Sequence, residues 1–294
     1  MKNMRKMTFL SILLVALLAL VAVGCTPEEE ADEQPGDEPT VQEAITIGYV
    51  TWDCAIASTH VLQTVLEDAG IEVDLIDPNA SLLYEGLANG DIDVITTAWL
   101  PFTHASYMNQ VGDQVDDLGS NYGGEARIGL VVPAYMDVDS IEDLAGQADN
   151  RIIGIDPGAG IMGAAESAIE AYGLDYELLD GSDAAMAATL ADAIANEEEV
   201  IVTGWAPHWK FGRWDLKFLD DPKEEFGAAE DIHTIARQGL AEDAPTAFEI
   251  INNFHWEDAD IATVMDMNSD GMDPKESARI WVDENQDKVQ EWLQ

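Results

Sequence analysis

From residue 44 onward, the chain alternates between short apolar runs and longer segments whose apolar side chains recur every three or four positions. Short apolar runs bounded by turn residues predict β-strands, and the longer period predicts helices. The expected strands are 44–50, 71–76, 91–99, 127–133, 151–156, 199–205 and 232–237. The expected helices are 53–69, 80–89, a segment after Pro101, 140–146, one opened by the glycine-rich turn 157–163 and ending at Tyr172, 183–196, and a helical tail from 243.

Strands that alternate with helices favour parallel α/β sheets. Two groups of such units predict two lobes, 44–133 and 134–237, the first completed by the C-terminal helices 238–294. A cleft between two lobes is a preferred place for a small ligand. We therefore expect an α/β fold with a ligand cleft between its lobes and hinges near 133–136 and 232–238.

The first 24 residues have the pattern of a targeting segment. Lys2, Arg5 and Lys6 precede an apolar run at 8–23, which ends in small residues before Cys25. This pattern resembles a lipoprotein signal peptide, after whose removal Cys25 becomes the lipid-modified first residue. An uncleaved membrane anchor is the alternative, although the run is short for a spanning helix.

Residues 25–43 predict an acidic linker. Positions 26–43 contain three prolines and eight acidic residues, with almost no apolar side chain. Such a composition favours an extended, disordered segment. The sequence therefore predicts a protein tethered by lipid to the outer face of the cytoplasmic membrane, with the linker holding the folded domain away from the surface.

Acidic residues dominate the charge of the chain. The 294 residues include 13 Lys and Arg against 58 Asp and Glu, a formal net charge of −45. A nucleic-acid-binding protein needs a basic face, so that class is excluded. The acid-rich, lysine-poor composition predicts a halophilic protein that stays soluble in high salt. With Cys25 lipidated, Cys54 has no partner for a disulfide, and we expect it to be a buried small residue.

Three tryptophans lie at the ends of predicted strands. Trp52, Trp99 and Trp205 each follow or close an apolar run. In open α/β sheets, the carboxyl ends of the strands face the ligand crevice. Packing in the core is the alternative for any one tryptophan, but three in equivalent positions predict a shared aromatic site.

The neighbouring residues suit a ligand with two opposite charges. Indole faces attract a quaternary ammonium, which cannot donate an ordinary hydrogen bond. The turn 158–161 opens a helix whose free N–H groups favour an anion, and His104 supplies a further donor. The turn lacks the Lys, Ser and Thr of a phosphate loop, so a carboxylate fits better than a nucleotide. Together these features favour a zwitterion such as glycine betaine.

The segments IGYVTWD, AWLPFTHASY, GIDPGAGIM and TGWAPHW carry a resemblance to a known family. Across residues 44–294, the chain resembles the substrate-binding lipoproteins of glycine betaine and proline betaine ABC importers. The resemblance implies a type II periplasmic-binding-protein fold, a monomer without cofactor or catalysis, and an ABC permease with its ATPase as partners. It implies these ligand-binding residues: Trp52, Trp99 and Trp205 around the ammonium, and His104 with the backbone amides of Gly160 and Ile161 at the carboxylate.

Several alternatives remain open at this point. Choline, carnitine or another quaternary ammonium is the alternative ligand, and an exported enzyme acting on such compounds is the alternative class. Ser58 and His60 are not expected to form a catalytic pair, because near neighbours on a helix point to different faces. His208 and Trp209 are expected to pack behind the site and support the hinge. No metal site is expected, since 220–222 reads as a turn and 265–273 lacks calcium ligands in register.

Overall fold

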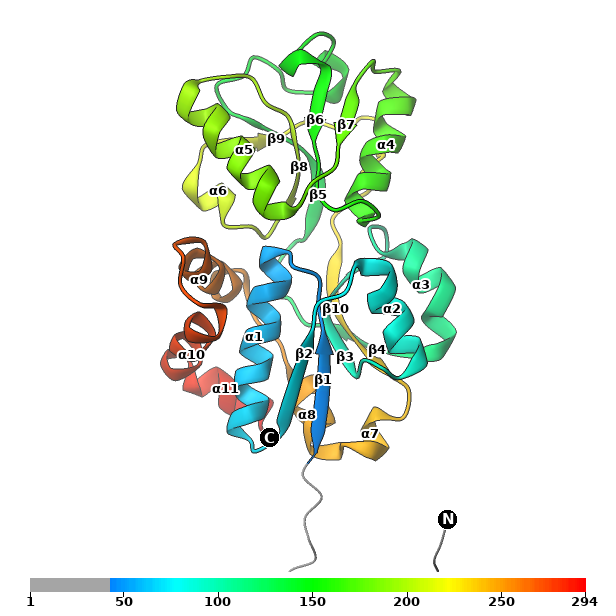
Figure 1. Ribbon diagram of the computed structural model, residues 1–294, viewed down its shortest axis with the longest axis vertical. Helices are drawn as coiled ribbons and strands as arrows, with labels where there is room; N and C mark the ends of the chain where they lie inside the picture. The colour runs from blue at the N-terminus through cyan, green and yellow to red at the C-terminus, as the bar shows by residue number, and fades with distance from the viewer. Residues whose placement is uncertain (1–42) are drawn as a thin grey trace, which may run out of the picture. The chain divides into compact units, whose positions relative to one another are not determined.

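The computed structural model describes residues 43–294 (Figure 1). The predicted signal peptide, the lipidation site at Cys25 and all but the last residue of the predicted linker lie outside the described residues. Within residues 43–294, no helix combines the length and the apolar character that crossing a bilayer requires.

The first lobe is built on a five-stranded sheet in the order β2-β1-β3-β10-β4. Its strands are β1 (Ala44–Gly48), β2 (Glu72–Ile76), β3 (Val94–Leu100), β4 (Val115–Ser120) and β10 (Asp231–Arg237). Strand β1 runs parallel to β2 and β3, whereas β10 runs antiparallel to β3 and β4. Its helices are α1 (Asp53–Asp68), α2 (Ala80–Asn89) and α3 (Ala105–Val111), with a 3₁₀ turn at Gly112–Gln114.

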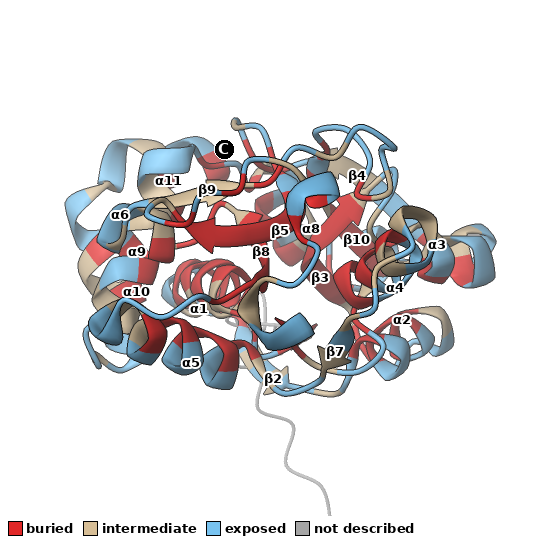
Figure 2. Cartoon of the chain, turned by 90° about the horizontal axis from the view of Figure 1, so that it is seen from above, coloured by how far each residue is buried: buried red, intermediate tan, exposed pale blue. Residues whose placement is uncertain are grey.

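The second lobe repeats this plan with the sheet order β7-β6-β8-β5-β9. Its strands are β5 (Arg127–Pro133), β6 (Arg151–Ile153), β7 (Glu177–Leu179), β8 (Val202–Ala206) and β9 (Leu216–Phe218). Its helices are α4 (Gly160–Tyr172), α5 (Asp183–Asn196) and α6 (Lys210–Arg213), with 3₁₀ turns at Ile141–Asp143 and Ala148–Asn150. Strand β5 runs antiparallel to both of its neighbours. Figure 2 shows β5 and β8 buried along most of their length.

The C-terminal helices complete the first lobe (Figure 1). They are α7 (Leu240–Asp243), α8 (Pro245–Asn253), α9 (Asp258–Ser269), α10 (Pro274–Glu284) and α11 (Gln286–Trp292). Helices α8, α9 and α10 pack against α1, and α7 and α11 pack against α8. Arg279 of α10 makes two hydrogen bonds of 2.6 and 2.8 Å to Asp68 at the end of α1. Trp281 and Trp292 stack in the core beneath. The tail thereby holds the helix whose opposite end carries Trp52.

The predicted lobe boundaries are wrong by one strand at each of the two crossings, the places where the chain passes from one lobe to the other. Strand β5 was expected in the first lobe but belongs to the second sheet, and β10 was expected in the second lobe but belongs to the first. Both are apolar runs, and an apolar run reveals a strand without revealing which sheet it joins. The crossings lie side by side, where Ala126 and Glu230 exchange backbone hydrogen bonds of 3.2 and 2.7 Å. The predicted hinge segments therefore fall beyond the crossings, inside or next to β5 and β10.

Most of the expected elements match in type, but the helix expected at 140–146 is only a 3₁₀ turn at Ile141–Asp143, and the short helix α6 was not expected. The α/β class is correct, but the two sheets are mixed rather than parallel, because the strand after each crossing runs against its neighbours. Strands β4, β7 and β9 were not predicted. Strand β4 contains two acidic residues and a glycine, and β7 and β9 have only three residues each, too few to establish an alternation.

The charge of this fold generates a prediction about salt. A net charge of −45 makes the folded state repel itself, and salt screens that repulsion. We expect the unfolding midpoint to rise by at least about 5 °C, or roughly 1–2 kcal/mol, between 0.05 and about 2 M potassium chloride. Thermal unfolding followed by circular dichroism measures this. Chloride is preferred to sulfate, since sulfate also strengthens apolar burial. Greatest stability at the lowest ionic strength would contradict the halophilic interpretation.

Candidate ligand-binding site

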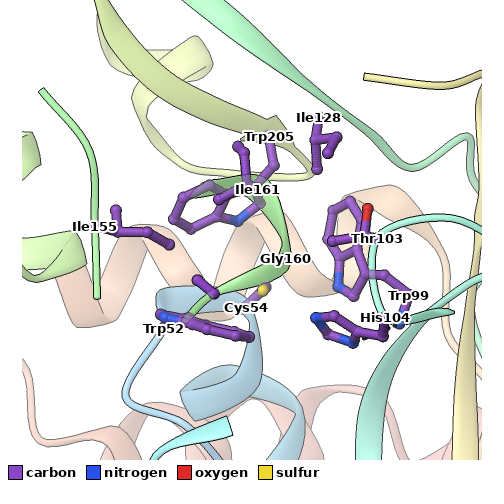
Figure 3. Close-up of a pocket in the computed structure, with 11 residues that line it drawn as sticks. Trp52, Cys54, Trp99, Thr103, His104, Ile128, Ile155, Gly160, Ile161 and Trp205 are labelled. Carbon is purple, nitrogen blue, oxygen red and sulfur yellow. Dashed lines mark hydrogen bonds between the residues drawn. The ribbon is translucent and has the colours of Figure 1, made fainter. Parts of the chain in front are cut away.

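A cavity with about 320 Å³ of empty space lies between the two lobes (Figure 3). The first lobe lines it with Trp52, Cys54, Trp99, Thr103 and His104. The second lobe lines it with Ile128, Ile155, Ala159, Gly160, Ile161 and Trp205. All six residues for which the sequence predicts a ligand contact therefore border one cavity, drawn from both lobes.

Three indoles form separate walls of this cavity (Figure 3). Trp52 immediately precedes α1, whereas Trp99 and Trp205 are each the next-to-last residue of their strands, β3 and β8. Their exposed fractions are 8%, 4% and 4%. The convergence expected from strand ends is therefore present, and the walls are shielded from bulk water.

Trp52 is fixed by a contact with the opposite lobe. Its Nε1 donates a 3.1 Å hydrogen bond to Oδ2 of Asp156, which precedes the glycine-rich turn. This bond orients the indole and ties the start of α1 to the start of α4. Asp156 was not predicted as a site residue, because nothing in its local sequence shows that it faces the other lobe.

The ring of His104 is held as a neutral donor. Its Nδ1 accepts a 3.1 Å hydrogen bond from the backbone N–H of Trp99, and the hydroxyl of Tyr84 lies 3.0 Å from the same atom. Because a backbone N–H can only donate, Nδ1 carries no proton, so the proton of the neutral ring is on Nε2. Burial lowers the pKa of His104 to about 3, so the ring stays neutral at physiological pH. No residue in 43–294 accepts from Nε2, which remains available to a ligand.

Two tyrosines support this histidine. Tyr84 of α2 is buried and stacks on Tyr107 of α3 with ring centroids 4.9 Å apart. The hydroxyl of Tyr107 donates to the carbonyl of Gly158 in the other lobe. Sequence reasoning did not identify either tyrosine, since only the packing of α2 against α3 brings them to the site.

The start of α4 offers two free backbone donors. Helix α4 begins at Gly160, and no side chain caps it. The N–H groups of Gly160 and Ile161 find no acceptor within the described residues, and the positive end of the helix dipole lies at the same place. This end of the cavity therefore suits an anion, whereas the indole walls suit a cation.

Gly160 also sets how closely the lobes approach. A Cβ at this position would lie 2.1 Å from the carbonyl oxygen of Thr103 in the other lobe, far inside van der Waals contact. The observed contact between the lobes therefore requires the hydrogen atom of glycine here.

Cys54 lines the cavity as an inert thiol. It is buried, as expected, and burial raises its pKa to about 12; it is a free thiol among the described residues. Ser58 and His60 do not pair: the hydroxyl of Ser58 lies 2.7 Å from that of Thr96, and His60 contacts Gln63. The described residues around the cavity thus provide binding groups rather than an activated nucleophile.

His208 and Trp209 lie behind the cavity wall. The ring of His208 packs edge-on against that of Trp205, with the ring centroids 4.9 Å apart. Nε1 of Trp209 donates a hydrogen bond to the carboxylate of Asp53 in the other lobe. They therefore join the lobes at the back of the site, where the sequence placed them.

Comparison with known proteins agrees with this geometry. A family model described as the substrate-binding domain of the ABC-type glycine betaine transport system matches residues 43–284. The chain belongs to this family. Among curated relatives, the glycine betaine/carnitine transport binding protein GbuC of Listeria monocytogenes is 48% identical over 170 residues. That match spans 57% of this chain and 56% of GbuC, little more than half the length of the relative.

Two solved structures share the fold over most of the chain. Lactococcal OpuAC, in its closed-liganded conformation with glycine betaine, is 38% identical with a TM-score of 0.84, covering 86% of this chain and 100% of that one. The glycine betaine/L-proline-binding protein ProX from Borrelia burgdorferi is 36% identical with a TM-score of 0.83, covering 86% and 97%. The predicted two-lobed binding-protein fold of this family member is thereby confirmed.

The tight contact at Gly160 generates a prediction. In Gly160→Ala, the added methyl group meets the carbonyl of Thr103, so the lobes cannot close fully. We expect the affinity for a ligand of the cavity to fall by about tenfold or more, equivalent to at least 1.4 kcal/mol. Titration calorimetry with glycine betaine measures the change.

Gly163→Ala is the matched control, because it lies on the same helix and a Cβ there meets nothing within 4 Å. Both variants should keep the thermal stability of the ligand-free protein. Equal affinity of the two variants would show that the lobes do not close on Gly160.

Proposed function

We propose that this protein captures glycine betaine, or a closely related betaine, and delivers it to an ABC permease and its ATPase. One observation carries the proposal: a single interlobe cavity joins three buried indoles to two free backbone N–H groups and a neutral histidine donor. The relatives named for glycine betaine support it. The protein acts without catalysis, as a lipid-anchored monomer at the outer face of the cytoplasmic membrane.

The indole walls account for the ammonium end. A trimethylammonium group spreads its charge over methyl groups that form no ordinary hydrogen bonds, so water and carboxylates hold it without much directional preference. An aromatic face attracts it by electrostatics and dispersion, at roughly 0.5–2 kcal/mol per face. With the lobes closed, three faces with 4–8% exposure form a site that is shielded from bulk water.

The opposite end of the cavity accounts for the carboxylate. The N–H groups of Gly160 and Ile161 and the Nε2–H of His104 are three donors without protein acceptors in the described chain. A carboxylate accepts all three, which removes the cost of leaving buried donors unpaired. Choline offers one neutral hydroxyl oxygen in place of a carboxylate, so it leaves at least one of these donors unsatisfied, and a betaine is therefore the better ligand.

Removing one wall of the cavity tests the ammonium site. We expect Trp52→Ala, Trp99→Ala and Trp205→Ala each to weaken glycine betaine binding by about tenfold or more, because each deletes one aromatic face. The corresponding Trp→Phe variants keep a smaller face and should lose less. Tryptophan fluorescence and calorimetry measure the affinities. Unchanged affinity in all three alanine variants would place the ammonium elsewhere.

His104→Ala tests the carboxylate site through ligand choice. We expect this variant to lose about 1–2 kcal/mol of affinity for glycine betaine and much less for choline, since only the betaine offers a charged carboxylate to Nε2. Competition binding with both ligands measures the difference. An equal loss for the two ligands would mean that His104 acts on the cavity as a whole rather than on the carboxylate.

A further inference from the structure

Four ionisable side chains meet at the junction of the lobes, directly behind two of the cavity walls. Asp183, His208 and Lys210 are buried, whereas the side chain of Asp53 keeps 30% of its surface exposed. Asp53 belongs to α1 of the first lobe, next to Trp52. Asp183, His208 and Lys210 belong to the second lobe, at α5 and at the segment from β8 to α6. Lys210 is fully buried, and Asp183 is 1% exposed. Burying such charges is costly unless opposite charges or hydrogen bonds compensate them.

Asp183 joins the two lobes as an ionised carboxylate. Its Oδ2 accepts a 3.1 Å hydrogen bond from the backbone N–H of Asp53, at the start of α1 in the other lobe. Its Oδ1 lies 3.2 Å from Nε2 of His208, whose Nδ1 accepts from the backbone N–H of Lys210, so Nε2 is the donor. Burial raises the pKa of Asp183, but the His208 hydrogen bond and the charge of Lys210 outweigh it and lower the pKa.

Asp53 brings a second carboxylate to the same place. Its side chain accepts from Nε1 of Trp209 across the junction and lies 3.7 Å from His208. Burial and the charge of Asp183 raise the pKa of Asp53 to about 6, against an ordinary value of 3.8. Closing the lobes therefore forces two negative groups together, and this approach opposes closure.

The ammonium of Lys210 is the compensating charge. Its Nζ makes no hydrogen bond within 43–294 and lies 4.2 Å from the centroid of the Trp205 ring. The ionisable groups facing it are Asp183, Asp53, Cys54 and His208. Burial lowers the pKa of Lys210 to about 8, while the two carboxylates favour its charged form. The side chain thus packs on the outer face of one cavity wall and balances the carboxylates behind the other.

We propose that Lys210 is a positioning residue for ligand binding: its ammonium allows Asp53 and Asp183 to meet across the lobes, which brings Trp52 and Trp205 together around the ligand. This inference rests on the proposed function, because it concerns closure around a betaine. Lys210 acts through the lobes and the indole and does not itself touch the ligand.

A metal ion is the competing explanation for the cluster. Asp53, Asp183 and His208 each offer a ligand atom, and these atoms lie within 4.8 Å of one another. The ammonium of Lys210 faces the same carboxylates, and Trp209 and the backbone of Asp53 already donate to their oxygens. A cation would meet repulsion from Lys210, which already offsets one of the two negative charges.

Lys210→Met tests the proposal, because it keeps the length and apolar stem and removes the charge. We expect its affinity for glycine betaine at pH 7, where the ammonium of Lys210 is charged in the wild type, to be at least about tenfold weaker than that of the wild type. The deficit should shrink as the pH falls to 5. Without Lys210, the pKa of Asp53 in the closed form rises further above its value in the open form. Closure then takes up a proton, so lowering the pH favours closure and restores the affinity for glycine betaine.

The double variant Lys210→Met with Asp53→Asn should recover most of the affinity and bind with little pH dependence, since only one carboxylate remains. Lys217→Met is the matched control: Lys217 lies in the same lobe, pairs with the exposed Asp139 at 2.6 Å, and should leave affinity unchanged. Removing Lys210 also raises the pKa of His208, which the charge of Lys210 lowers in the wild type. The single and double variants both lack Lys210, so the difference between their pH profiles reports on Asp53. Chelation with EDTA should alter none of these affinities.

Each outcome bears on one statement. If the wild type does not bind glycine betaine, the proposed function fails. If the wild type binds and Lys210→Met binds equally well with the same pH profile, the role of Lys210 fails. A loss of affinity in EDTA that zinc or calcium reverses would assign the cluster to a metal instead. If Lys210→Met does not fold, the Asp53→Asn variant provides the test. The affinity of the wild type for glycine betaine should rise from pH 7 to 5, whereas that of Asp53→Asn should stay constant. If the affinity of Asp53→Asn rises as much as that of the wild type, the inference is overturned.

Discussion

Closing two lobes over a small ligand is costly unless most of the polar groups that closure buries find a partner at the junction. This constraint governs the described part of the chain. Trp52 donates to Asp156, Tyr107 donates to Gly158, and Trp209 donates to Asp53, each across the lobes. Three donors at one end of the cavity have no protein acceptor in the described chain: the N–H groups of Gly160 and Ile161 and the Nε2–H of His104. Nε1 of Trp205 and Nζ of Lys210 are also buried without a hydrogen-bond partner among residues 43–294. The unmet donors at the start of α4 therefore describe the carboxylate of the ligand.

The same constraint explains why the walls of the cavity come from rigid positions. Trp99 and Trp205 lie within buried strands, and Trp52 stands at the start of a helix that the C-terminal tail holds in place. Their indoles need no rearrangement to present their faces. The affinity then depends on how completely the lobes close, and the close approach of Gly160 to Thr103 limits how far they can close. Binding and closure are in this way one event.

The sequence predicted those site residues whose role can be recognised from their immediate neighbours in the chain. Tryptophans at strand ends, a glycine-rich turn before a helix and a histidine after Trp99 each carry their meaning in a few neighbouring residues, and the cavity brings all of them together. Tyr84, Asp183 and Lys210 could not be found in this way, because their roles arise from helices that meet only in the folded chain. Likewise, β5 and β10 were recognisable as strands, but their sheets were exchanged, since an apolar run is compatible with either lobe.

A crystal structure of the protein with glycine betaine tests the central claim most directly. The account predicts the trimethylammonium group between Trp52, Trp99 and Trp205, with the carboxylate within hydrogen-bond distance of the Gly160 and Ile161 N–H groups and of Nε2 of His104. A ligand bound in the reverse orientation, or outside this cavity, would contradict it.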